Sequence, residues 1–103
     1  MEINPDCIPW DLLVSSVDRI FESKGWVMPT PQDAATFMAQ EAHEVIDIFL
    51  REKSYVRNHT RDVDTLNTEI AQAFMMWVVT CRVSGVNGFE VFSDFYRQMM
   101  QGE

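Results

Sequence analysis

The chain has few cysteines, few basic residues and no long apolar run. Its two cysteines, Cys7 and Cys81, lie far apart and match neither a zinc-ligand spacing nor a CxxC redox motif, so we expect two free thiols. The longest apolar stretch, 73–79, is far too short to cross a bilayer, and the N-terminus lacks the basic and apolar segments of a signal peptide. We therefore expect a cytoplasmic protein that does not associate with membranes.

Positive charge is scarce as well. Eight lysines and arginines face sixteen aspartates and glutamates, which gives a net charge of −8. Such a field repels nucleic-acid backbones and anionic lipid headgroups, so we expect no nucleic acid polymer as a partner. A compact anion such as a nucleotide can still bind where divalent cations or a few basic groups offset the negative field. The charge therefore favours metal dependence if the ligand carries phosphate.

Proline and glycine are limited to four residues each, and they sit mainly where helices should start or stop. Nowhere do β-branched residues alternate with polar ones over a useful length, so the sequence predicts no strand. The 103 residues fit one domain, and an apolar content of 47% is ordinary for a globular core. We therefore expect a single all-α domain spanning residues 1–103.

The first two helices are predicted from apolar spacing and from the residues at their ends. Apolar residues at helical spacing fill 10–21, and Gly25 follows as a left-handed C-terminal cap. Thr30 is placed to cap a second helix, which should run to about Lys53. The polar segment 54–61 then predicts a loop.

Two more helices are predicted in the second half of the chain. One covers roughly 63–84 and is apolar nearly all round between 70 and 79, which requires neighbours on several sides. Asn87 and Glu90 resemble a capping box that opens the last helix. This helix is amphipathic, and we expect it to pack on the others through Phe89, Phe92, Phe95, Tyr96, Met99 and Met100. A chain this short has little capacity to cover so much apolar surface, so we also expect a homo-oligomer.

Two glutamates of the second helix lie at or within its apolar face. On a helical wheel, Glu41 falls inside the arc defined by residues such as Phe37 and Ile48, and Glu44 lies at its margin. A buried carboxylate without a partner is costly or has a strongly raised pKa. Glu41 should therefore meet a cation, a lysine or arginine from a neighbouring helix, or the water of a groove.

A second polar pair precedes the apolar run of the third helix. Glu69 and Gln72 are three residues apart and so share one face, as Glu41 and Glu44 do. The two helices would then present both pairs to a shared pocket. Carboxylate and amide oxygens are the ligands that Mg²⁺ prefers, usually together with waters and substrate phosphates. The sequence therefore predicts a metal site for phosphate chemistry.

These residues resemble the motifs of the MazG-like nucleoside triphosphate pyrophosphohydrolases, part of the all-α superfamily that includes dimeric dUTPases. The resemblance covers 31–87. It rests on Glu41-Ala-His-Glu44, which matches the family's ExxE, and on Glu69-Ile-Ala-Gln72, which stands where the family has ExxD. It implies a four-helix MazG-like bundle completed by oligomerisation, as a homodimer or a homotetramer.

The resemblance also implies an activity. Family members hydrolyse a nucleoside triphosphate to a monophosphate and pyrophosphate with a metal-activated water, some as house-cleaning enzymes. Glu41, Glu44 and Glu69 would be the catalytic carboxylates and, with Gln72, the ligands of Mg²⁺ or Mn²⁺. The nearest candidates for contact with the base are Trp10, Trp26, Phe37 and His43, although Trp10 and Phe37 fit a core better and His43 falls on the polar face.

One departure from the family pattern keeps alternatives open. Gln72 replaces the aspartate of ExxD and brings no negative charge, so metal affinity should fall. Either the site works with fewer acidic ligands, or it has lost catalysis and only binds a nucleotide or a protein. A third reading is an unrelated acidic helical bundle used purely for protein interaction, in which Glu41 is a paired core residue and the methionine-rich end of the last helix is a docking surface. Arg97 is the nearest basic candidate for a phosphate contact in the last helix.

Overall fold

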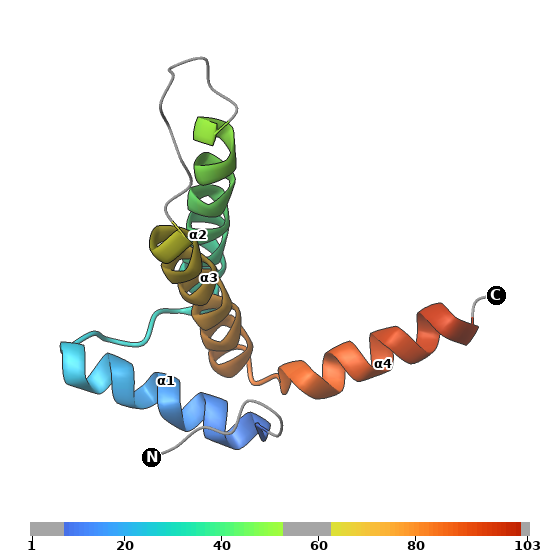
Figure 1. Ribbon diagram of the computed structural model, residues 1–103. Helices are drawn as coiled ribbons and strands as arrows, with labels where there is room; N and C mark the ends of the chain where they lie inside the picture. Colours follow the sequence, from blue (N-terminus) through green and yellow to red (C-terminus); the bar gives the residue numbers. More distant parts are fainter. Residues whose placement is uncertain (1–7, 53–62, 102–103) are drawn as a thin grey trace.

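The computed structural model describes residues 8–52 and 63–101, which form four helices and no strand (Figure 1). Cys7, Lys53 and the predicted loop 54–61 lie outside the described residues. No helix in the described ranges combines the length and the apolarity that a membrane crossing needs. The all-α prediction is confirmed, and the helices in chain order are α1 (Trp10–Lys24), α2 (Pro31–Glu52), α3 (Val63–Val83) and α4 (Gly88–Gln101).

The end of α1 and the start of α2 follow the predicted capping. Gly25 has a φ of 70°, and the amide of the next residue, Trp26, donates to the carbonyl of Phe21 at 2.9 Å. The hydroxyl oxygen of Thr30 accepts a hydrogen bond from the amide of Asp33 at 3.2 Å. The end of α1 and the start of α2, at either end of the connection 25–30, are therefore each fixed by a local hydrogen bond.

The turn between α3 and α4 is built in the same way. Gly85 ends α3 with a φ of 71°. The side-chain oxygen of Asn87 accepts from the amides of Phe89 at 3.0 Å and Glu90 at 3.1 Å, which confirms Asn87 as the cap of α4. The direction in which α4 leaves α3 is fixed by this short turn.

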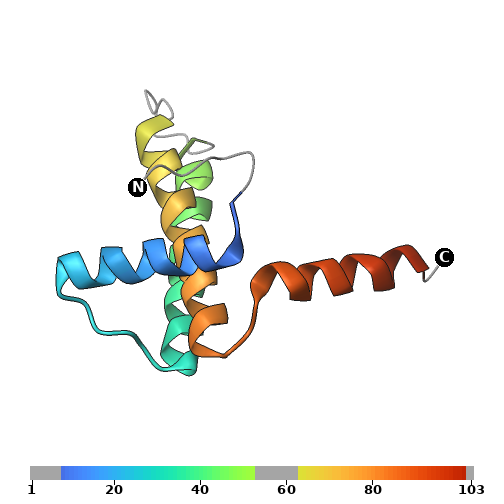
Figure 2. The same ribbon diagram turned by 90° about the horizontal axis from the view of Figure 1, so that it is seen from below.

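The third helix is central, as its apolar sequence predicts. α3 packs against α2 on one side and against α1 on the other, and α1 crosses it at a steep angle (Figures 1 and 2). Val78 and Val79 of α3 are fully buried. The core around them is completed by buried residues from three helices, namely Val17, Phe21, Ala34 and Met76.

The predicted packing of the last helix on the others is wrong for the single chain. α4 extends away from α1 and α2, and only its first turn is anchored (Figures 1 and 2). Gly88 is buried next to Trp77 and Trp10, and the ring of Phe89 meets Trp10 edge-on with 5.2 Å between centroids. The sequence periodicity of α4 reports an apolar face, but the turn before it points that face away from this chain's own core.

The anchoring of α4 gives a testable prediction at Gly88. Alanine normally stabilises a helix by up to about 1 kcal/mol relative to glycine. A Cβ at position 88 would lie 2.7 Å from Cη2 of Trp77 and 2.9 Å from Cη2 of Trp10, both too close. We expect Gly88→Ala to cost about 1–3 kcal/mol, seen as a lower Tm in a circular dichroism melt. Ser93→Ala, on the exposed part of α4, should change stability by less than about 0.5 kcal/mol. Equal Tm values for the two variants would refute this account of the α4 anchor.

Candidate metal centre and its two pockets

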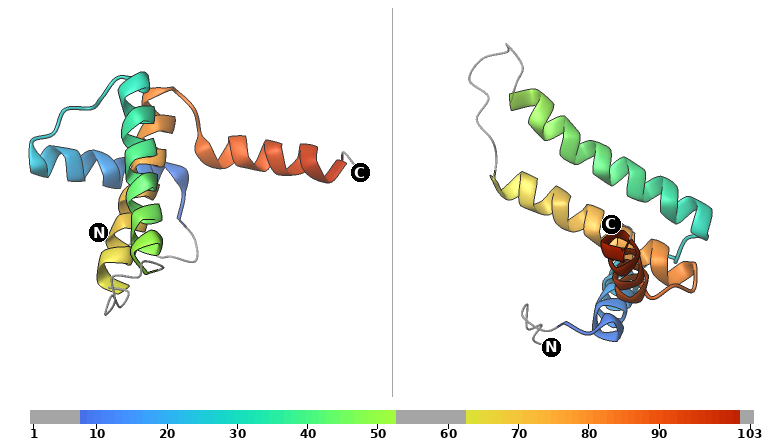
Figure 3. Two further views of the ribbon diagram at one scale, coloured as in Figure 1. Left: turned by 90° about the horizontal axis from the view of Figure 1, so that it is seen from above. Right: turned by 90° about the vertical axis from the view of Figure 1, so that its right-hand side faces the viewer.

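The candidate site lies on the facing surfaces of α2 and α3. The two helices run antiparallel (Figure 3). Residue numbers therefore rise along α2 in the direction in which they fall along α3. Glu41 is thereby opposite Gln72, and Glu44 is close to Glu69. The two polar pairs predicted from the sequence are therefore brought together, each with its three-residue spacing on one helix face.

Three carboxylates converge at this place. One oxygen from each of Glu41, Glu44 and Glu69 can be chosen so that all three lie within 4.8 Å of one another. Mg²⁺ binds oxygen at about 2.1 Å in octahedral geometry, so two of its ligands are about 3 Å apart when adjacent and about 4.2 Å apart when opposite. The carboxylates converge on nearly this scale, and the all-oxygen donor set suits a hard cation. The residues present thus fit Mg²⁺ or Mn²⁺.

Gln72 completes the cluster as a hydrogen-bond donor. With its amide nitrogen toward the carboxylates, it donates to Oε2 of Glu41 at 3.1 Å and to Oε2 of Glu69 at 3.2 Å. This orientation satisfies both the amide and the two carboxylates. Turning the amide over would present its oxygen instead, as a neutral metal ligand. The same side chain can therefore serve the cluster with or without a cation.

Glu41 is the most constrained of the acidic groups. Its side chain is partly buried, whereas that of Glu44 is exposed. Partial burial, then the charge of Glu44 and a hydrogen bond with its side chain, raise the pKa of the Glu41 carboxyl above its ordinary value. Within the described part of the chain, no lysine or arginine pairs with Glu41. The negative charge is therefore held at a cost, which a cation would relieve.

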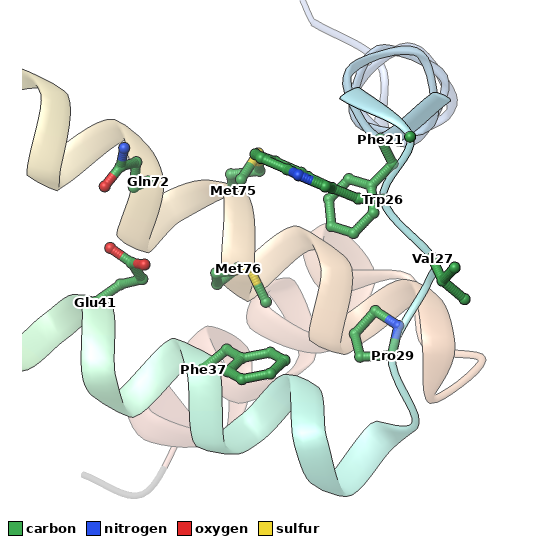
Figure 4. A pocket seen from close by; sticks show the side chains of 10 residues that line it. Phe21, Trp26, Val27, Pro29, Phe37, Glu41, Gln72, Met75 and Met76 are labelled. Atoms are coloured by element: carbon green, nitrogen blue, oxygen red, sulfur yellow. The ribbon is translucent and has the colours of Figure 1, made fainter. Parts of the chain in front are cut away.

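An aromatic pocket of about 550 Å³ opens on one side of the cluster (Figure 4). Glu41 and Gln72 face each other at one end of it, and Phe37 and Trp26 lie along its length. The edge of the Trp26 ring rests on Phe21 with 5.5 Å between centroids. The remaining wall comes from Gly25, Val27, Pro29, Met75 and Met76. This pocket has the apolar lining and few polar groups that are typical of small-molecule sites.

A second, more polar pocket of about 410 Å³ lies on the other side of the cluster. Glu44 and Glu69 line it, together with Asp47, Ile48 and Thr65. The carboxylates thus form the boundary between an aromatic pocket and an acidic one. A ligand with an apolar ring and a charged tail could place the ring in the first and reach a cation at the boundary.

The other sequence candidates fall in different places. Trp26 and Phe37 line the aromatic pocket, but Trp10 belongs to the contact with Trp77 and Phe89, at 5.7 Å and 5.2 Å between ring centroids. His43 is exposed and lies 3.6 Å from Asp47.

Arg97 is remote from the carboxylates. It pairs with Asp94 on the exposed surface of α4, which extends away from the site (Figure 1). No described basic residue lines either pocket beside the cluster. Among the described residues, only a cation held by the carboxylates would then offset the charge of a phosphate at this place.

Part of the pocket wall was not predicted from the sequence. Phe21 reads as a core residue of α1, and Met75 and Met76 read as part of an apolar helix. They line the site because the segment 25–29 runs from the end of α1 to the start of α2 and closes one end of the pocket (Figure 4). The glycine and proline of this segment predict a turn, but they do not predict which surface of the protein the turn covers.

Comparison with known proteins returns no matching family model, no matching curated protein and no matching solved structure.

Proposed function

We propose that this chain is a Mg²⁺-dependent nucleoside triphosphate pyrophosphohydrolase, with Mn²⁺ as an alternative metal. The observation that carries the proposal is the convergence of Glu41, Glu44 and Glu69 from two helices at the border of an aromatic pocket. A nucleotide has a planar ring and a polyphosphate, which match the two sides of this border. The motif resemblance at the same residues points to the same chemistry.

The layout suggests how a nucleotide would lie. Its base would enter the pocket beside Trp26 and Phe37, where aromatic faces favour stacking. Its phosphates would extend past Glu41 toward the acidic pocket of Glu44 and Glu69. Carboxylates repel phosphate, so a divalent cation between them is needed for this pose.

The reaction would be hydrolysis of the anhydride bond between the α and β phosphates. Water oxygen bonds to phosphorus, the anhydride bond breaks, and pyrophosphate and a monophosphate leave. A cation held by the cluster would polarise the phosphates and lower the pKa of a coordinated water. The cluster carboxylate that is not occupied with the cation would accept the proton of the attacking water. We propose a house-cleaning role for the chain in the cytoplasm, where nucleoside triphosphates are abundant. We also propose that the chain acts there as a homodimer or a homotetramer.

The test is pyrophosphate release from a panel of ribo- and deoxyribonucleoside triphosphates, with Mg²⁺, with Mn²⁺ and with a chelator. We expect release only with metal, and preferentially from a few bases. Absence of release with every nucleotide, at concentrations where calorimetry detects binding, would reject the enzyme.

The aromatic pocket has its own prediction. Trp26→Ala should remove one stacking surface and raise KM by about tenfold, with kcat within about twofold of wild type. Val27→Ala is the matched control, since Val27 is the neighbouring residue of the same pocket but is 87% exposed. A KM equal to that of the control would place the base elsewhere.

A second candidate function is a catalytically impaired module that binds a nucleotide or a protein. The observation that favours it is the position of Gln72, whose amide nitrogen, when turned toward the cluster, donates to Glu41 and Glu69 at 3.1 and 3.2 Å, where a cation would otherwise neutralise them. Such a site can remain folded without metal. Nucleotide binding that does not require Mg²⁺ would support this reading over the enzyme.

A further inference from the structure

The aromatic pocket has a negative charge at one end and no positive charge in its lining. Among the described residues that line it, Glu41 is the only charged one, and it lies opposite the neutral Gln72 (Figure 4). The whole chain carries a net charge of −8, which adds to the negative potential around the pocket. A planar ring that carries a positive charge is therefore attracted to this pocket more strongly than a neutral ring of the same shape.

The rest of the pocket carries aromatic side chains from two different elements. Phe37 belongs to α2, and Trp26 belongs to the segment that follows α1 (Figure 4). Phe37 is 45% exposed and Trp26 is 51% exposed, so both rings are accessible to a ligand. Aromatic faces carry a negative potential that attracts cations, and indole attracts them most strongly. The aromatic walls thus favour the same sign of ligand charge as Glu41 does.

Hydrogen-bonding side chains are few along these aromatic walls. Apart from the indole N–H of Trp26, the described side chains there are apolar or lack a strong donor or acceptor, as Phe37 and Met75 do. Enzymes that read a neutral base do so by hydrogen bonds to its Watson–Crick edge. A single N–H donor cannot pair with an edge that presents both donors and acceptors. Selection by the charge of the ring needs no such partner, because it acts through the aromatic faces.

We propose that the site prefers nucleoside triphosphates whose base is positively charged because a ring nitrogen carries an alkyl group. Such a base keeps the planar ring that stacks on Trp26 and Phe37, and it adds a charge that both rings attract. Its alkyl group adds apolar surface that Met75 and Met76 cover. The reaction of this substrate class rests on the proposed hydrolase, whereas recognition of the charged base is measured without hydrolysis.

The test compares isomers that differ in the position of one methyl group. 1-Methyladenosine is a cation at neutral pH, whereas its isomer N6-methyladenosine is neutral; 3-methylcytidine and 5-methylcytidine form a second pair of the same kind. Titration calorimetry with these four nucleosides, without metal and without phosphate, measures the aromatic pocket alone. We expect the cationic isomer of each pair to bind about tenfold more tightly, and this advantage to shrink as salt screens the charge.

Substitutions at Trp26 separate the effect of its ring from the loss of apolar volume. Trp26→Phe keeps an aromatic face and should keep most of the preference, whereas Trp26→Leu should reduce it to about twofold. Phe95→Leu removes a ring from the exposed part of α4, outside the lining of this pocket, and should leave the preference unchanged. If Trp26→Leu does not fold by circular dichroism, Phe37→Leu takes its place, with a preference below about fivefold expected. A full tenfold preference in the leucine variant would overturn the proposal.

Hydrolysis of the matching triphosphates distinguishes this inference from the proposed function. With Mg²⁺ we expect the KM of the 1-methyladenosine triphosphate to be about fivefold lower than that of its N6-methyl isomer, at similar kcat, because the metal offsets part of the negative charge. Equal binding of the isomers, or no binding of the cationic nucleosides at millimolar concentration, would overturn the preference even if both triphosphates are hydrolysed. Tighter binding of the cationic nucleosides without hydrolysis of any triphosphate would support the preference and reject the enzyme.

Discussion

Glu41→Gln is expected to lower metal-dependent pyrophosphate release by at least about 100-fold and, in the absence of metal, to raise the Tm of the protein. Loss of one anionic ligand removes several kcal/mol of cation stabilisation, and each 1.36 kcal/mol is a factor of about ten in rate. The same change removes a partly buried carboxylate whose pKa is raised by burial and by Glu44. Because Glu41 remains partly solvated, we expect a gain of only about 2–4 °C. Pyrophosphate-release kinetics and melts with and without Mg²⁺ measure both effects.

A matched control is Glu22→Gln, which removes the same charge from an exposed position of α1 that lines neither pocket beside the cluster. It should leave both the rate and the response of Tm to Mg²⁺ unchanged. Opposite movement of rate and metal-free stability is the signature of an acidic ligand site, since a purely structural glutamate would lose both together. Full activity in Glu41→Gln would remove the cluster from the proposed reaction.

Local chemistry explains why the helix ends were predictable from the sequence. Thr30, Gly25 and Asn87 act within three or four residues of their own position, through one hydrogen bond or one left-handed φ. The facing of Glu41 and Gln72 required one further step, because two helix faces of known spacing meet when the helices pair antiparallel. The core of the candidate site was therefore accessible from periodicity.

Non-local packing explains what could not be predicted. The periodicity of α4 identifies its apolar face, but not whether that face meets its own chain or another copy. That choice depends on the turn before α4 and on the fit of Gly88 beneath Trp77 and Trp10. The aromatic pocket depends in the same way on the path of residues 25–29, which places Trp26 over α3. Neither the direction of α4 nor the path of residues 25–29 produces a periodic pattern in the sequence.

Gln72 connects the two candidate functions, because it is the position where this chain departs from an all-acidic site. An aspartate there would place a fourth carboxylate beside Glu41 and Glu69 and would remove the donor that both now share. The metal-free protein would then be less stable, and a cation would have more charge to bind. Stability without metal and affinity for metal are therefore expected to trade against each other at this residue.

Gln72→Asp is accordingly expected to increase Mg²⁺ and Mn²⁺ affinity by about tenfold, to raise the rate of pyrophosphate release, and to lower the metal-free Tm by several degrees. Titration calorimetry with metal alone measures the first effect, and melts with a chelator measure the last. Gln40→Asp makes the same substitution at an exposed position of α2 and should alter neither quantity appreciably. If the wild-type protein shows no hydrolysis, and Gln72→Asp both gains metal affinity and becomes active, the native glutamine is what restrains catalysis. If metal affinity stays unchanged, the three glutamates do not form the cation site, and the proposed metal-dependent hydrolase loses its support.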